Sequence, residues 1–157
     1  TKTDILAMDV AEFFSDMLKK YRIPPKYLDI DIARSAYLET HGALGDTIAQ
    51  LQQMGFRVIL DGFDGDYIGL SAVGEMSTDV LKLDLRSAEM AHKTANLPAV
   101  FAQARSLRLT LLAEGIESAD QLNALRKCGC TEGQGYFFSR PLSVSEFATI
   151  LKVGHAG

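Results

Sequence analysis

The chain contains 157 residues, of which 47% are hydrophobic and 23% are charged, and its formal net charge is −4. This composition is typical of one globular domain, and the acidic balance excludes a broad basic face for duplex nucleic acid. No apolar run approaches the ~20 residues that a bilayer-spanning helix needs, so we expect a cytoplasmic protein or the cytoplasmic part of a larger, membrane-anchored one.

Hydrophobic periodicity predicts helices and strands in alternation through the first half of the chain. Apolar side chains recur at helical spacing up to Tyr21, and Pro24 with Pro25 ends that pattern. The expected elements, in chain order, are a helix over Asp4–Tyr21, a strand over Tyr27–Ile32, a helix over Ala43–Met54, a strand over Arg57–Asp61 and a loop over Gly62–Gly69.

The second half continues the alternation, with residues 87–96 predicted as either a helix or a loop. The expected elements are a strand over Val80–Leu83, a helix over Leu97–Leu107, a strand over Thr110–Ala113, a helix over Ala119–Lys127, a strand over Gly133–Phe137 and a terminal helix through Leu151. Ser118 with Gln121, and Ser143 with Glu146, have the spacing of a capping box at the start of the last two helices.

The five expected strands are short and almost entirely apolar, and helices separate them. This pattern favours an α/β fold in which helices cover a parallel sheet, arranged as one domain. Cys128 and Cys130 are the two cysteines, and the three histidines are scattered without the ligand spacing of a zinc site. We therefore expect reduced cysteines rather than a metal centre.

The segment Leu111–Leu142 is the most informative part of the chain. An apolar run ends in the carboxylate Glu114, which Gly115 and Glu117 follow, and the segment later reads GQGYFFSRP. Parallel α/β barrels place their chemistry at such strand-to-loop positions. The order and spacing of these elements resemble the C-terminal part of the EAL-domain family, whose members hydrolyse or sense cyclic di-GMP.

The resemblance implies a modified TIM-like (β/α)8 barrel, a fold of about 250 residues. Residues 1–157 resemble its last five β/α units, so the chain is expected to be a partial EAL domain whose first barrel strands lie before Thr1. Five strands cannot close a barrel, so the first strand is expected to present an unpaired edge. Three explanations for the missing strands are open. The strands belong to the native protein and precede this chain, or another chain pairs with the edge, or the protein is a natural truncation. We favour the first explanation.

The resemblance also implies a two-metal mechanism in active members, where carboxylates and an Asn hold Mg²⁺ or Mn²⁺ beside the scissile phosphate. At two of these positions the chain departs from the family. Arg34 stands in place of a metal-binding Glu, and Gly62 replaces the second of two paired acids, of which Asp61 is retained. Asp64 and Asp66 are expected to be turn residues rather than replacement ligands.

Four polar positions match the family. Lys82 matches a lysine that lies beside the attacking water, Glu114 a metal-binding acid, Glu117 an acid that braces a loop, and Gln134 a residue that contacts water or ligand. Arg140 is expected either to brace the last loop or to touch the ligand. The aromatic run Tyr136-Phe137-Phe138 is expected to belong to the core rather than to a base-stacking surface.

Arg34 places a positive charge where a dication would bind. At ~4 Å and an effective dielectric near 20, one contact between unit charges is worth about 4 kcal/mol, so this exchange weakens metal binding by several kcal/mol. Two interpretations of Arg34 stay open: an ion pair with a neighbouring acid, Asp61 being the nearest candidate, or a bidentate contact with a ligand phosphate.

We therefore predict a catalytically degenerate EAL domain that needs no cofactor and acts as a cyclic di-GMP receptor or regulatory module. The expected ligand-binding positions are Arg34, Asp61, Lys82, Glu114 and Gln134. One alternative is an active phosphodiesterase with Mg²⁺ or Mn²⁺ on Asp61 and Glu114 and with Lys82 and Gln134 at the catalytic positions. In that case Asp64 or Asp66 substitutes at the metal, and the preceding strands supply a Glu and an Asn. The other is a ligand-free module that binds a protein partner or a second copy of itself.

Overall fold

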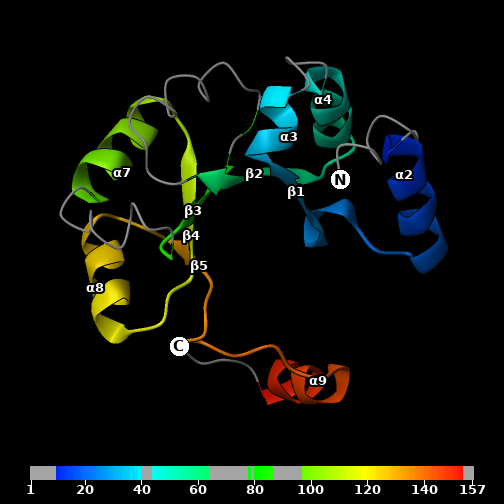
Figure 1. Cartoon of the computed structure of the whole chain (residues 1–157). Helices are drawn as coiled ribbons and strands as arrows, with labels where there is room; N and C mark the ends of the chain where they lie inside the picture. The colour runs from blue at the N-terminus through cyan, green and yellow to red at the C-terminus, as the bar shows by residue number, and fades with distance from the viewer. Residues whose placement is uncertain (1–9, 40–43, 64–77, 79, 87–96, 154–157) are drawn as a thin grey trace.

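The structure is a computed structural model that describes residues 10–39, 44–63, 78, 80–86 and 97–153 (Figure 1). Five parallel strands form one curved sheet in the order β1-β2-β3-β4-β5. The strands are β1 (Asp29–Ala33), β2 (Arg57–Phe63), β3 (Val80–Asp84), β4 (Thr110–Glu114) and β5 (Glu132–Gly133). The expected parallel sheet is therefore confirmed, and β1 and β5 are its edges.

Helices lie between β1 and β2, between β3 and β4 and between β4 and β5, and most of the described helices cover one face of the sheet. The helices are α2 (Val10–Tyr21), α3 (Arg34–Glu39), α4 (Gly45–Gln53), α7 (Leu97–Ser106), α8 (Ala119–Lys127) and α9 (Val144–Val153), with a short 3-10 helix at Pro25–Tyr27. Helices α3, α4, α7 and α8 lie along the convex side of the sheet, whereas α9 lies away from them, beneath the opposite side (Figure 1). No helix in the described residues is long and apolar enough to cross a membrane.

The two faces of the sheet differ because side chains alternate along each strand. On the helix-covered face, Leu81 and Leu83 of β3 are fully buried in the main core, which also includes Leu60, Leu111 and Ala113. The concave face carries only a small apolar layer, formed by Ile59, Val80 and Leu112. Polar side chains flank that layer, and one group of them lies where the strands end, at their carboxyl ends.

Most element boundaries lie close to those expected, and the differences have local causes. The first strand begins at Asp29 rather than Tyr27 because Pro25–Tyr27 closes a 3-10 turn, in which the Leu28 amide donates to the Pro25 carbonyl. A short helix, α3, follows β1 directly and was not expected. Strand β2 extends through Gly62 to Phe63, with an irregularity in its pairing to β3 between Leu60 and Phe63.

The last strand is much shorter than the expected Gly133–Phe137. After Gly133 the chain leaves the sheet because its backbone bonds to the loop after β4: the Phe137 amide donates to the Ile116 carbonyl at 2.9 Å. Gly135 packs so closely on this loop that an added Cβ would lie 2.2 Å from the Ile116 oxygen. The close approach requires glycine and redirects the chain toward α9.

The capping box expected for α8 is confirmed, since Ser118 accepts from the Gln121 amide and Gln121 accepts from the Ser118 amide at 3.0 Å. Glu146 and Ser143 form the equivalent pair before α9. The start of the first expected helix (residues 4–9), Ala43, the loop residues Asp64 and Asp66, and residues 87–96 lie outside the described residues.

Candidate functional site at the carboxyl ends of the strands

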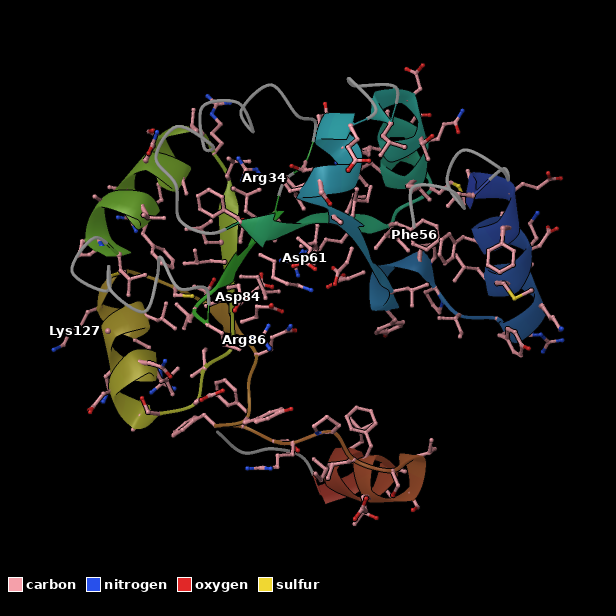
Figure 2. The ribbon with its side chains drawn as sticks, viewed as in Figure 1. Arg34, Phe56, Asp61, Asp84, Arg86 and Lys127 are labelled. Atoms are coloured by element: carbon pink, nitrogen blue, oxygen red, sulfur yellow. The ribbon has the colours of Figure 1, made fainter. Side chains whose placement is uncertain are left out.

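The polar residues singled out in the sequence follow neighbouring strands, and the structure brings the ends of these strands together. Arg34 follows β1, Asp61 lies near the end of β2, and Glu114 is the last residue of β4. Figure 2 shows Arg34, Asp61, Asp84 and Arg86 distributed along the curve of the sheet, whereas Lys127 at the end of α8 points away from it. Parallel strands align their carboxyl ends in this way, which is why α/β folds build their sites there.

Both carboxylate oxygens of Glu114 accept hydrogen bonds from neighbouring side chains. Arg86 Nη2 donates to Oε1 at 2.7 Å, and Gln134 Nε2 donates to Oε2 at 3.0 Å. The Glu114 side chain is only 16% exposed, so these donors replace water around a largely buried charge. Glu114 and Gln134, expected to share a site, are in direct contact.

Arg86 was not predicted from the sequence, yet it connects two of the acids. Its Nε donates to Asp84 Oδ1 at 2.9 Å and its Nη2 to Asp84 Oδ2 at 3.3 Å, beside the bond to Glu114. Burial of Asp84 raises its pKa, but the hydrogen bonds and the charge of Arg86 outweigh burial and lower that pKa below its usual value. In turn, the hydrogen bonds to Asp84 and the charges of Asp84 and Glu114 raise the pKa of Arg86.

Gly115 makes room for this arginine. Its φ of +74° lies in the left-handed region, and an added Cβ would lie 2.7 Å from Cγ of Arg86. The aliphatic part of Arg86 therefore crosses the backbone at Gly115 on its way to Glu114. The Glu114-Gly115 pair was visible in the sequence, but the reason for the glycine was not.

Lys82 is also paired with an acid that the sequence reasoning missed. Its side chain is 8% exposed, and its Nζ donates to Asp31 Oδ2. The two residues belong to β3 and β1, so the ion pair reaches over β2 on the concave face. The available signal was the alternation of Asp29 and Asp31 with isoleucines along the first strand, which places both acids on one face.

A second ion-pair cluster lies at the opposite, amino ends of the strands. Arg57, the first residue of β2, contacts Glu132 of β5 at 2.6 Å and Asp29 of β1 at 3.6 Å. Arg57 of β2 thus forms ion pairs with β1 and β5 across the concave face. Since it lies at the other end of the sheet, we regard it as part of the scaffold rather than of the site.

A pocket of about 490 Å³ opens beside Glu114. Its polar lining includes Arg86, Glu114, Glu117, Gln134 and Arg140, and its apolar lining includes Tyr136, Pro141, Leu142 and Phe147. The guanidinium carbon of Arg140 lies 5.2 Å from the centre of the Tyr136 ring, a cation–π contact. Charged donors and flat apolar surfaces therefore share one cavity.

The aromatic run preceding Arg140 does not belong to the core, contrary to expectation. Tyr136, Phe137 and Phe138 are 56%, 42% and 49% exposed. The cause is the early end of β5, because the chain after Gly133 runs over the surface rather than through the sheet. Both cysteines are free, as expected. Cys128 is buried, and burial raises the pKa of the half-buried Cys130.

The described acidic side chains are dispersed rather than gathered around one point. Within the described residues, no three His, Cys, Asp or Glu side chains are grouped closely enough to hold an ion. Of the two expected ligands, Glu114 already has a guanidinium on one oxygen. Mg²⁺ and Mn²⁺ need several anionic oxygens around one point, and this arrangement supplies a cation instead.

Comparisons with known proteins agree with this architecture. The family model described as EAL domain matches residues 2–141. Cyclic di-GMP phosphodiesterase RocR of Pseudomonas aeruginosa is 29% identical over 143 residues, which cover 88% of this chain and 36% of RocR. The chain spans 17 to 36% of the length of the curated relatives that it matches.

Two solved structures extend the similarity to three dimensions. The EAL domain of Mycobacterium smegmatis DcpA is 26% identical, with a TM-score of 0.79 over 94% of this chain and 68% of that one. The manganese and cyclic di-GMP complex of Klebsiella pneumoniae BlrP1 is 25% identical, with a TM-score of 0.72 over 85% of this chain and 35% of that one. With the strand order, these similarities confirm the expected fold, the C-terminal portion of a TIM-like (β/α)8 barrel.

Proposed function

Because this chain belongs to the EAL domain family, we propose that it is a member that binds cyclic di-GMP without hydrolysing it. It acts as a receptor or regulatory module in cyclic di-GMP signalling. Residues 1–157 form the C-terminal part of the EAL domain, and the first barrel strands precede them.

One observation carries the proposal: the guanidinium of Arg86 lies 2.7 Å from Glu114, the acid that the family resemblance assigns to a metal. A divalent ion at Glu114 would have to displace this cation or bind beside it, and both cost electrostatic energy. The changes at Arg34 and Gly62 act in the same direction, since one adds a positive charge and the other removes a carboxylate. Without a metal-activated water, the phosphodiester stays intact.

The choice of ligand is supported by the relatives and by the chemistry of the strand ends. RocR is named for its action on cyclic di-GMP, and BlrP1 was solved with it. A ligand with two phosphates needs cationic donors, and Arg34, Lys82 and Arg86 all lie at or near the carboxyl ends of the strands. We assign Arg34, Asp61, Lys82, Glu114 and Gln134 to the ligand site, and a bracing role for the loop after β4 to Glu117.

Calorimetric titration with cyclic di-GMP tests the proposal, using protein that includes the first barrel strands, once with EDTA and once with Mn²⁺ or Mg²⁺. Each titrated sample is then analysed by chromatography for the linear dinucleotide. We expect binding in EDTA and intact ligand under every condition. Hydrolysis that depends on added metal would establish a phosphodiesterase instead, and the absence of binding under all conditions would leave a protein-interaction module.

A further inference from the structure

We propose that Arg86 and Arg140 form the phosphate-binding pair of the pocket, with Arg86 shared between Glu114 and a ligand phosphodiester in place of a metal. This inference rests on the proposed function, which it deepens by naming the groups that hold the phosphate. Neither arginine was among the ligand positions expected from the sequence, except that Arg140 was left between a bracing and a binding role.

Arg86 has the geometry of a preformed anion site. Asp84 and Glu114 accept from Nε and Nη2 of its guanidinium, so these bonds leave the two N–H groups of Nη1 for another acceptor. The side chain is 57% exposed and lines the pocket. An arginine that is fixed by two carboxylates loses little conformational entropy on binding, and its planar fork suits a phosphate.

The position of Arg86 is determined by its surroundings rather than by chance packing. Its backbone amide donates to Asp84 Oδ1 at 2.9 Å, so residues 84 and 86 form a tight local unit at the end of β3. Gly115 leaves the space that the stem of Arg86 occupies. These two contacts hold the guanidinium at the rim of the pocket, next to the acid that the family would use for a metal.

Arg140 contributes a second positive charge to the same pocket. It is exposed, and Tyr136 holds its guanidinium through the cation–π contact. Pro141, Leu142 and Phe147 provide apolar surface nearby. Two guanidinium groups beside flat apolar walls suit a phosphodiester that carries aromatic bases, because phosphate binds the former and a base packs on the latter.

Removing the charge of Glu114 distinguishes a phosphate-binding role of Arg86 from a purely structural role. If Arg86 binds phosphate through Nη1, Glu114 keeps its bond to Nη2, but its negative charge lies close to the phosphate and repels it. Replacing Glu114 by the isosteric Gln should then strengthen binding. If Arg86 only braces Glu114, substitution of either residue should weaken binding, because each would disturb the same local structure.

The experiment is calorimetric titration with cyclic di-GMP in EDTA of the protein that includes the first barrel strands, using Arg86→Gln, Arg140→Gln and Glu114→Gln. Arg108→Gln is the matched control, since Arg108 is exposed and lies just before β4, at the opposite end of the sheet. We expect the dissociation constant to rise about tenfold or more for Arg86→Gln, because it loses charge-assisted hydrogen bonds. It should rise several-fold for Arg140→Gln, fall for Glu114→Gln and stay unchanged for Arg108→Gln.

Thermal unfolding followed by circular dichroism verifies that each variant is folded, and Arg86→Lys, which keeps the charge, should recover part of the affinity. Wild-type affinity in Arg86→Gln or Arg140→Gln would overturn the pair while leaving the proposed function intact. Equal weakening in Arg86→Gln and Glu114→Gln would also overturn it. Failure of the unmodified protein with its first barrel strands to bind in EDTA would instead refute the proposed function, and this inference with it.

Discussion

Lys82 of β3 donates a hydrogen bond to Asp31 of β1, so that an ion pair spans β2 on the concave face of the sheet. The ammonium group is almost inaccessible, whereas the Asp31 side chain is 44% exposed. Burying an ammonium without a partner is costly, so Asp31 is the residue that allows a lysine in this position. The family resemblance places Lys82 beside the attacking water, and Asp31 fixes where its charge lies.

Asp31→Asn should therefore destabilise the protein through Lys82. We expect a loss of about 1–2 kcal/mol in the free energy of unfolding, which is less than for a fully buried pair because Asp31 is partly exposed. Urea unfolding measures it. Asp29→Asn is the control on the same strand: its 3.6 Å contact with Arg57 is exposed and should be worth less than about 0.5 kcal/mol.

A double-mutant cycle separates this pair from general damage. In Lys82→Met, Asp31→Asn should cost much less than in the unmodified chain, because no buried ammonium remains to be satisfied. Additive effects of the two substitutions would show that the residues are not coupled.

Gly115→Ala should disturb both stability and ligand binding. A left-handed φ costs an alanine about 1 kcal/mol, and the new Cβ would also meet the Arg86 stem. Gly55→Ala is the control, since its φ is +89° but its nearest contact, with Pro25, is an ordinary 3.7 Å. We expect the left-handed φ to lower the free energy of unfolding by a similar amount in both variants. Cyclic di-GMP binding should weaken only for Gly115→Ala. Equal affinity in both variants would argue against a role for the Arg86 position.

Restoring the acidic residues at the strand ends should recover metal binding. We expect Arg34→Glu combined with Gly62→Asp to increase the affinity for Mn²⁺, measured by calorimetry or electron paramagnetic resonance, because it removes a cation and adds two carboxylates. Gly62 has a φ of +87° with open space around its Cβ position, so the aspartate should cost about 1 kcal/mol of stability without a steric clash. Adding Arg86→Gln should raise the metal affinity further.

An unchanged Mn²⁺ affinity in the folded double variant would mean that positions 34 and 62 do not correspond to the metal-binding positions of the family. The fold of the variant must be verified first, since Arg34 begins α3 and Gly62 lies within β2.

The Asp84–Arg86 contact should make stability depend on pH in acid. The pKa of Asp84 is lower in the folded chain than the usual value near 3.8, so the folded state favours the charged carboxylate. Its contribution is present above that value and is lost as the pH falls through the lower, folded-state pKa. We would measure the free energy of unfolding in urea for the unmodified chain and for Asp84→Asn from pH 6 to pH 2.5. This free energy should fall less toward low pH in the variant. An equal fall in both proteins would contradict the prediction.

Ser118→Ala should remove the capping box of α8 and lower the free energy of unfolding by about 1 kcal/mol. The loss has two parts, since the Gln121 amide loses its acceptor and Gln121 Oε1 loses the bond from the Ser118 hydroxyl. Asn123→Ala, on the exposed surface of the same helix, is the control and should be neutral or slightly stabilising because alanine favours helix. Equal unfolding midpoints in the two variants would show that the cap contributes nothing.

Local patterns in the sequence were sufficient to predict the order of the elements and the position of Glu114 at the end of a strand. The run that ends in Glu114 predicted a strand with an acid at its carboxyl end, and Ser118 with Gln121 predicted the start of α8 to the residue. Both signals are local, because strand alternation and helix capping involve residues within a few positions of one another.

The contacts that define the site required the tertiary structure. Lys82 and Asp31 are 51 residues apart, and Arg86 and Glu114 are 28 apart. Which strands are neighbours, and how they are aligned in register, decides whether such side chains meet, and periodicity carries no information on either. The exposure of the aromatic run at residues 136–138 was likewise set by the bonds that end β5 early. The sequence thus determined which residues lie at the strand ends, whereas sheet register and curvature decided which charges they neutralise.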